Sequence, residues 1–237
     1  AFQVVLQSNG GEGMRLDLTE FSRGSGIQTI NFDLSSHAGN VVATGSVAVS
    51  TTNGIYQFGT VTDTVGTGFA TVVEALSGTT IVRNTDTTAF DPNEALSTVN
   101  YLVGSGSQAM VANGSMYSLT IHATDGGSMN GVTLRTNALL MQEGTKDYTF
   151  NNNLFGTSNS ARIYVHQYST NGVLTFNGQV GYGISNANNY FIKAGPGAVR
   201  IGSSGSLVSA NTTYIQGGRF IVDGEILRSV TVSVFHT

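Results

Sequence analysis

The sequence predicts an all-β protein built as a β-solenoid, with little or no helix. Three observations predict this class: the expected strands are short, Gly, Asn or Ser bounds almost every one, and charged residues make up only 10% of the chain. An ordinary soluble domain has about 25% charged residues, so the surface must consist largely of Ser, Thr, Asn and Gly. Small polar side chains of this kind could stack in ladders between successive coils.

Short segments of alternating apolar and polar residues recur along the chain, as expected of half-buried strands. The clearest lie at Ile27–Leu34, Ser118–His122, Gly131–Arg135, Ala161–Val165, Gly172–Phe176, Ala198–Ile201, Thr213–Ile215 and Arg219–Val222. A β-sandwich would give a similar spacing of strands. The shortness of the strands and the uncharged loops between them favour a solenoid instead.

One elongated domain over residues 1–237 is expected, because no Pro-rich or charged linker divides the chain. Residues 1–105 are expected to form longer, irregular rungs, and residues 106–237 tighter and more regular ones. The best helical signal is the segment that starts at Asp91-Pro92, with Asp91 as N-cap and Glu94 at the third helical position. It predicts one helical turn in a loop.

Composition excludes several classes of function. The net charge is −4 and Lys146 and Lys193 are the only lysines, so no basic stripe exists for nucleic acid or an anionic membrane surface. No apolar run reaches the roughly 18 residues that a spanning helix needs, so membrane insertion is not expected. The chain has no Cys, which excludes disulfides, Fe–S clusters and thiolate zinc sites.

Motifs for catalysis are missing as well. The four His do not lie at metal-ligand spacing, and neither Gly-x-Ser-x-Gly nor a P-loop occurs. Carboxylates are sparse, so we expect no enzyme and no cofactor. The one group of oxygen ligands that could suit calcium comprises Asp86, Asp91 and Glu94. The alternative for this group is an Asx-turn and a helix cap.

The first and last apolar segments carry no charge. Phe2–Leu6 and Ser229–Phe235 both alternate, and an open solenoid end exposes unpaired strand backbone. We therefore expect the chain to associate with itself by end-to-end stacking, as a homo-oligomer or filament. The candidate residues are Phe2, Val4, Leu6, Val230, Val232 and Val234. The alternative is that both strands simply close the coil within one chain.

Tyrosines suggest a second possible contact surface. An outward strip of tyrosines could bind surface glycans or a partner, and the alternative is that the rings stack between rungs. The candidates are Tyr164, Tyr168, Tyr182, Tyr190 and Tyr214.

The segment at 190–224 resembles the autotransporter-associated β-strand repeat of Gram-negative surface proteins. The pattern of that repeat is matched by Lys193, Gly195, Gly197, Asn211, Thr212, Thr213, Gly217, Gly218 and the strand Phe220–Val222. The sequence departs from the pattern in the middle, where Ser203–Val208 stands in place of the usual Gly-Ala-Asn-Thr-Tyr segment. The clear resemblance covers about 35 residues, and a weaker one covers most of the chain.

The resemblance implies a right-handed parallel β-helix at the bacterial cell surface or secreted from it. It implies a structural or adhesive, non-enzymatic role; the alternative is a β-helix that binds or cleaves polysaccharide. The opening Ala1-Phe2-Gln3 would fit a mature N-terminus left by signal-peptide cleavage.

Overall fold

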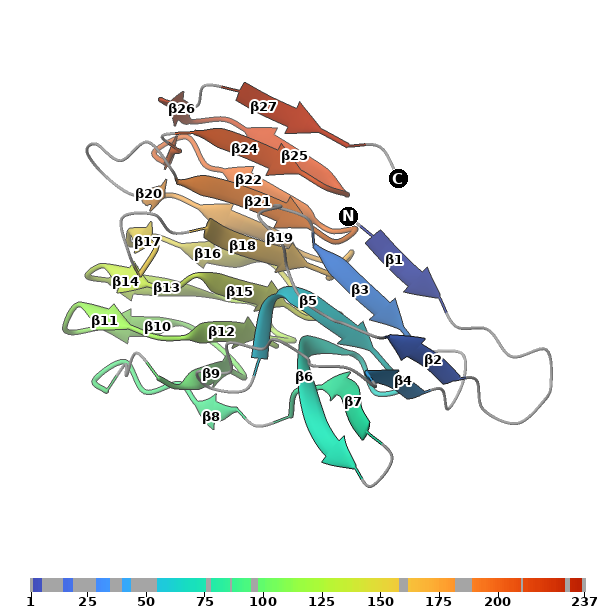
Figure 1. Cartoon of the computed structure of the whole chain (residues 1–237). Coiled ribbons are helices and arrows are strands. Elements are labelled where there is room, and N and C mark those ends of the chain that lie inside the picture. Colours follow the sequence, from blue (N-terminus) through green and yellow to red (C-terminus); the bar gives the residue numbers. More distant parts are fainter. Residues whose placement is uncertain are drawn as a thin grey trace. The chain divides into compact units, whose positions relative to one another are not determined.

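A computed structural model describes the chain as strands and the turns between them (Figure 1). The described residues are 2–5, 15–18, 29–34, 40–43, 55–75, 78–85, 87–94, 98–157, 162–181, 189–209, 211–228 and 231–235. No helix occurs among them, and therefore none that could cross a membrane. The chain forms two compact units, Ala1–Asp86 and Thr87–Thr237. The expectation of a single elongated domain stays a prediction.

The first unit holds a mixed sheet of seven strands in the order β1-β3-β5-β6-β7-β4-β2. β1, β3 and β5 pair in parallel, as do β2 and β4, whereas β5, β6, β7 and β4 pair antiparallel. The strands are β1 Phe2–Val5, β2 Arg15–Leu18, β3 Ile30–Asp33, β4 Asn40–Ala43, β5 Ile55–Thr62, β6 Thr67–Ala75 and β7 Gly78–Arg83.

Residues 55–83, expected to form longer rungs, form an antiparallel meander instead. The reason lies in the turn between β5 and β6. The Asp63 carboxylate accepts hydrogen bonds from the backbone N–H groups of Val65 (2.8 Å) and Gly66 (3.0 Å). Its other oxygen accepts from Arg83 Nε at 2.8 Å, which ties the turn to β7. An Asx-type turn of this kind reverses the chain tightly, whereas a rung needs a crossover to a parallel strand.

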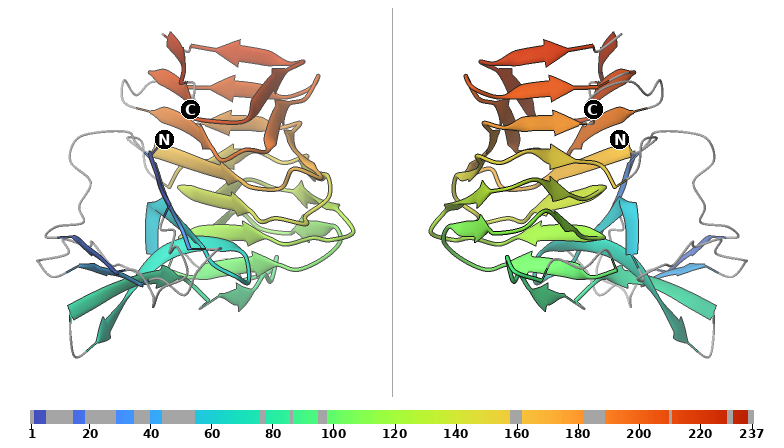
Figure 2. Two further views of the ribbon diagram at one scale, coloured as in Figure 1. Left: turned by 90° about the vertical axis from the view of Figure 1, so that its right-hand side faces the viewer. Right: turned by 90° about the vertical axis from the view of Figure 1, so that its left-hand side faces the viewer.

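The second unit is a stack of coils with a β-solenoid-like fold (Figure 2). From β9 onward the chain visits three all-parallel sheets in a fixed order, which excludes a sandwich of antiparallel strands. Sheet B contains β8 Thr88–Ala89, β9 Asn100–Val103, β12 Ser118–Ile121, β15 Ala138–Met141, β18 Arg162–Gln167, β21 Tyr190–Ala194, β24 Thr212–Ile215 and β27 Thr231–Val234. Sheet C contains β10 Gln108–Met110, β13 Gly127–Gly131, β16 Tyr148–Phe150, β19 Val173–Phe176, β22 Ala198–Ile201 and β25 Arg219–Val222. Sheet D contains β11 Gly114–Ser115, β14 Leu134–Arg135, β17 Leu154–Phe155, β20 Gln179–Gly181, β23 Ser206–Val208 and β26 Glu225–Leu227.

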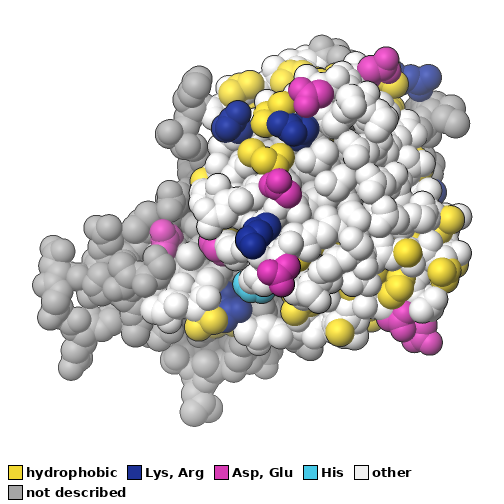
Figure 3. All heavy atoms as spheres, turned by 180° about the vertical axis from the view of Figure 1, so that it is seen from behind, with side chains coloured by type: hydrophobic (Ala, Val, Ile, Leu, Met, Phe, Trp, Pro, Cys, Tyr) yellow, Lys and Arg dark blue, Asp and Glu magenta, His cyan; other side chains and the backbone are white. Residues whose placement is uncertain are grey.

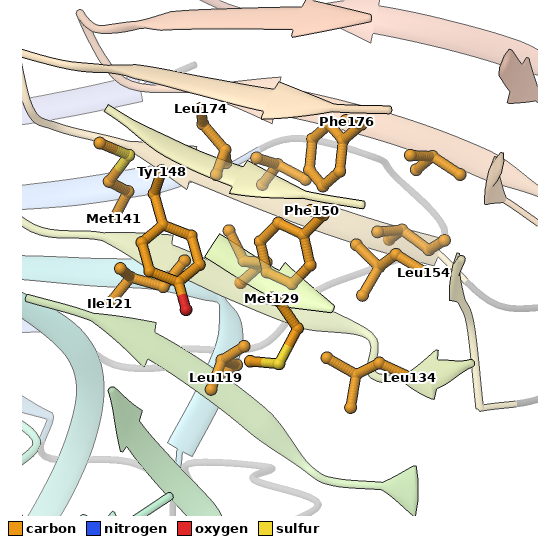
Figure 4. Packing of buried hydrophobic residues seen from close by; sticks show 14 of the residues in the cluster. Leu119, Ile121, Met129, Leu134, Met141, Tyr148, Phe150, Leu154, Leu174 and Phe176 are labelled. Carbon is orange, nitrogen blue, oxygen red and sulfur yellow. The ribbon is translucent and has the colours of Figure 1, made fainter. Parts of the chain in front are cut away.

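The core of the second unit is a column of apolar side chains that point into the coils (Figure 4). Strict register places like residues above one another: Phe150 in β16 lies opposite Phe176 in β19. Their rings stack with centroids 5.4 Å apart and an interplanar angle of 27°. Both side chains are fully buried. Such stacking adds to the large hydrophobic contribution of each ring.

Small polar side chains form the predicted ladders between coils. Asn151 Nδ2 donates to Asn130 Oδ1 at 2.8 Å, and Asn177 Nδ2 donates to Asn151 Oδ1 at 2.9 Å. The asparagine column stops at the next coil, where Gly202 follows Asn177, and a Cβ at Gly202 would lie 2.0 Å from Asn177 Oδ1. These amides replace charged groups as the outward-facing polar surface. Figure 3 shows the result on one face, where most atoms belong to neither charged nor hydrophobic side chains.

A second column of polar side chains is buried at the turns that lead from sheet B to sheet C. Thr145 Oγ1 donates to the Ile121 carbonyl at 3.1 Å, and Ser169 Oγ donates to the Thr145 carbonyl. Gln167 Nε2 donates to the Ala198 carbonyl one coil further on, at 3.1 Å. Each bond joins one coil to the next, so the turns are held together by side chains as well as by the sheets.

Tyr148 carries one of several buried polar atoms that are left unsatisfied, as is Oε1 of Gln167. Its side chain is fully buried in β16, and its hydroxyl has no hydrogen-bond partner. Figure 4 shows the hydroxyl among apolar neighbours. Burial also raises the pKa of this phenol well above its usual range. A buried hydroxyl without a partner costs about 1–3 kcal/mol.

Tyr148→Phe is therefore expected to stabilise the protein, by about 1 kcal/mol, because it removes the hydroxyl and keeps the ring. Thermal unfolding should show a melting temperature higher by about 2–4 °C. Tyr101→Phe is the matched control, since the Tyr101 hydroxyl donates to the Glu94 carbonyl at 2.5 Å. That variant should lose stability. A loss of stability in Tyr148→Phe would mean that the hydroxyl has a partner after all.

Candidate functional site: the open end of the coil

The last three strands of the second unit form its terminal coil, which comprises β25, β26 and β27. Each is the final strand of its sheet: β25 pairs only with β22, β26 with β23 and β27 with β24 among the described residues. One edge of each strand is therefore left without a paired neighbour in that part of the chain. Unpaired edges of this kind are templates for another strand.

The terminal coil exposes the side chains that every earlier coil buries. Val222, Val232 and Val234 are 41%, 45% and 61% exposed. Their register partners one coil earlier are Ile201, Thr213 and Ile215, which are 0%, 0% and 4% exposed. The positions are equivalent, and two of the three partners are apolar as well, so the main difference is the presence of a covering coil. Phe220 and Ile226 complete this apolar ring and are partly buried against the core.

The rim of the terminal coil carries charges of both signs. Arg219, Asp223, Glu225 and Arg228 are all exposed. The Asp223 carboxylate also lies 3.4 Å from Arg200 Nε, in an exposed ion pair with little effect on stability. An apolar centre with a mixed polar rim is the usual composition of a protein–protein interface.

The start of the coil is covered by its own chain. The Phe90 ring packs edge-to-face on Tyr101, with centroids 5.7 Å apart and an interplanar angle of 86°. Phe90 N–H donates to the Leu102 carbonyl at 2.9 Å. The inward-facing Tyr101, Val103 and Met110 are consequently buried, at 3%, 1% and 3% exposure. Phe90 and Val99 are themselves partly buried against the core, as Phe220 and Ile226 are on the terminal coil.

The predicted self-association residues fall partly within this site. Val232 and Val234 lie on the terminal coil and are exposed. Phe2 and Val4 lie on β1, whose backbone but not side chains is described, and Leu6 and Val230 lie outside the described residues. The alternation of the last segment did not reveal Val222, Phe220 and Ile226, because they come from two other strands that only the coil brings beside β27.

The calcium candidates do not form a site in the described part of the chain. Asp91 and Glu94 are exposed, Asp86 lies outside the described residues, and no group of three metal-ligating side chains occurs among those described. Asp91 Oδ1 accepts hydrogen bonds from the backbone N–H (2.8 Å) and side-chain amide (3.0 Å) of Asn93. Residues 91–94 thus form the Asx-turn of the alternative interpretation, and the remainder of the predicted helical turn lies outside the described residues.

The candidate tyrosines were expected either to form an outward strip or to stack between rungs, and the structure shows features of both. Tyr164 is buried, at 2% exposure, whereas Tyr190 and Tyr214 are partly exposed on the outer face of sheet B. Tyr190 stacks on Tyr214 and Tyr214 on Phe235, with centroids 6.0 and 6.1 Å apart. The rings largely cover one another's faces, so they brace successive coils. Tyr168 is partly exposed, and Tyr182 lies outside the described residues.

Lys193 holds the terminal coil to the coil before it. The side chain is fully buried inside β21, between Val165 and Ile215 in register. Its Nζ donates to the carbonyls of Gly195, at 2.6 Å, and of Gly217 at the next turn. A side chain on Gly218, whose φ is +64°, would lie 2.3 Å from this Nζ, so glycine is required there. Burial lowers the pKa of Lys193 to about 7.

Searches against protein-family models, curated proteins and solved structures found no match for this chain.

Proposed function

We propose that this chain is an extracellular structural or adhesive surface protein that associates with copies of itself through its terminal coil. The single observation that carries the proposal is the apolar ring of Val222, Val232 and Val234. Burying this ring against another apolar surface is favourable at roughly 25 cal/mol per Å² of apolar area. A second copy offers both such a surface and strand edges of matching spacing.

The proposal includes a right-handed parallel β-helix for the second unit. Connections between parallel strands of one sheet are right-handed in about 98% of cases, because of the twist of the strands. The resemblance to the autotransporter-associated β-strand repeat supports the same handedness and a bacterial surface location. The contacts of Lys193 with Gly195 and Gly217 support the resemblance, because they give three of its matched positions one shared physical role.

Val234→Asp is expected to weaken self-association at least about tenfold, because burying the new carboxylate without a partner is costly. Sedimentation velocity over a range of concentrations would measure the change. The wild type should shift to larger species as concentration rises, and the variant should remain at a mass near 24.7 kDa. Far-UV circular dichroism would check that the variant folds.

Val111→Asp is the matched control. Val111 is 67% exposed, close to the value for Val234, but it lies in the turn after β10, far along the coil from the terminal strands. This variant should associate like the wild type. Monomeric wild-type protein at all concentrations would refute the proposal, and so would equal weakening by the two substitutions.

A further inference from the structure

We infer that Asn171 is a site of spontaneous deamidation, and the most reactive of the asparagines that precede a glycine in the second unit. Glycine has no Cβ, so its backbone nitrogen can approach the preceding side-chain amide without obstruction. Six such pairs occur in the chain: Asn9-Gly10, Asn53-Gly54, Asn113-Gly114, Asn130-Gly131, Asn171-Gly172 and Asn177-Gly178. The first two lie outside the described residues, and the other four belong to the second unit.

The reaction needs a free amide, a free backbone nitrogen and water. The nitrogen of Gly172 gives up its proton to hydroxide and forms a bond to Cγ of Asn171. The bond from Cγ to Nδ2 then breaks, and the amide nitrogen takes up a proton and leaves as ammonia. Water opens the five-membered imide at one of its two C–N bonds, which gives aspartate or isoaspartate. Overall, one water is consumed and one ammonia is released.

Three hydrogen bonds hold the amide of Asn130 in place. Its Nδ2 donates to the Gln108 carbonyl at 3.3 Å and to Ser128 Oγ at 2.8 Å. Its Oδ1 accepts from Asn151 Nδ2 at 2.8 Å, as part of the asparagine column. All three bonds oppose a turn of this amide toward the nitrogen of Gly131, so Asn130 is expected to be the least reactive of the four.

Fewer bonds hold the amides of Asn113 and Asn177. Asn113 Oδ1 accepts from the Thr133 N–H at 3.1 Å. The Gly114 N–H, which would have to attack, donates to the Thr133 carbonyl at 3.2 Å. The Asn177 side chain has one bond, from its Nδ2 to Asn151 Oδ1 at 2.9 Å. Both asparagines are therefore partly protected, Asn113 more than Asn177.

Asn171 lacks this protection. It is exposed in the turn between β18 and β19, where its backbone N–H donates to Ser169 Oγ at 3.3 Å and its side chain has no partner among the described residues. The Gly172 N–H has no partner there either, although the Gly172 carbonyl accepts from Gln167 Nε2 at 2.9 Å. Backbone N–H groups without a protein partner are nearly always bonded to water, so the attacking nitrogen is open to solvent.

The product would change the turn that leads from sheet B to sheet C. Either product adds a carboxylate two residues before Val173, whose N–H already donates to the Asp147 carboxylate at 2.8 Å. Isoaspartate also lengthens the main chain by one carbon directly before Gly172. That glycine packs tightly on the previous coil, where a Cβ would lie 2.4 Å from the carbonyl carbon of Lys146. Deamidation is therefore expected to loosen this turn.

Peptide mapping by mass spectrometry tests the ranking. Folded protein is incubated at mildly alkaline pH, and the fraction of aspartate plus isoaspartate at each of the four pairs is followed over time. Asn171 should react at least about fivefold faster than Asn177, because one hydrogen bond of ordinary strength lowers the reactive population by roughly that factor. Asn113 should follow, and Asn130 should be last.

Two controls show whether the fold sets this order. In urea, where no ladder or turn holds the amides, the four pairs should react at similar rates. Asn171→Gln removes the reactive pair, since attack on the longer side chain must close a less favourable six-membered ring, and ammonia release by the folded protein should fall accordingly. The inference would be overturned by a faster reaction at another of the four pairs, by the same order in urea, or by an Asn171 that stays intact while the unfolded chain reacts.

Discussion

Phe176→Ala is expected to lower the free energy of unfolding by about 3–5 kcal/mol, the usual cost of removing a buried phenylalanine ring. The Phe176 side chain is fully buried in β19, between Phe150 and Ile201 in register on the neighbouring coils. Its removal loses the stacked contact with Phe150 and leaves a cavity that strict register prevents the coils from closing. Urea unfolding followed by circular dichroism would measure the loss.

Phe235→Ala is the control for this change. Phe235 also stacks on an aromatic ring, that of Tyr214, but it is 46% exposed on the outer face of sheet B. We expect it to cost no more than about 1 kcal/mol, since little apolar surface leaves water when its ring packs. Equal losses in the two variants would contradict a core that is built from rings stacked inside the coils. Total stabilities of 5–15 kcal/mol make the expected difference a large fraction of the whole.

The sequence predicted the sheet strands that alternate and missed those that do not. Ser118–His122 and Gly172–Phe176 were expected and correspond to β12 and β19. β15 is Ala-Leu-Leu-Met and is buried on both faces, so it has no period of two. β17 has only Leu154 and Phe155, too few residues to show any period, whereas β14 lies within the expected segment Gly131–Arg135. Short strands of this kind are defined by the coils above and below them, which a single sequence does not reveal.

Parity alone did not reveal the interior position of Lys193. Phe191 and Lys193 stand two residues apart in β21, so their side chains face the same side. The neighbouring Tyr190 is also a large aromatic residue but lies on the outer face, so the sequence did not show which of the two faces is inward. A lone cation in an alternating strand is normally assigned to the solvent side, because buried lysines are rare. One of its acceptors, the Gly195 carbonyl, is two residues away, and the other, the Gly217 carbonyl, comes from a turn 24 residues along the chain.

The exposed apolar surface of the terminal coil was only partly predictable from the sequence. The uncharged alternation of Ser229–Phe235 indicated an exposed edge, and Val232 and Val234 do lie there. The sequence did not indicate that Phe90 packs on the first strands of the coil. Phe90 directly precedes the segment that was expected to form a helical turn, and its packing on Tyr101 shows that it covers part of the start of the coil.

The stability of the protein should rise with pH between about 7.5 and 9.5 because of Lys193. Burial lowers the pKa of this lysine to about 7 in the folded chain, against about 10.4 in an unfolded one. Between these two values the unfolded chain binds a proton that the folded chain does not. Stability therefore increases with pH, by up to about 1.4 kcal/mol per pH unit. Over this window the gain should be about 2 kcal/mol.

Lys193→Met isolates this contribution. Methionine nearly preserves the length and apolar stem of lysine and removes the titrating amine. The variant should lose most of the pH dependence, although the Gly195 and Gly217 carbonyls lose their donor. The measurement is urea unfolding of both proteins at pH 7.5 and 9.5, and the quantity compared is the change in unfolding free energy between the two values.

The surface lysine provides the internal control. Lys146→Met removes the other lysine of the chain, which lies in the turn between β15 and β16. That variant should keep the wild-type pH dependence, because its lysine is not held among buried carbonyls. The phenol of Tyr148 does not interfere, since its pKa is raised and it ionises above this window. Equal pH dependence in wild type and Lys193→Met would mean that Lys193 keeps an ordinary pKa, and so that water reaches the turn that joins the terminal coil to the rest of the stack.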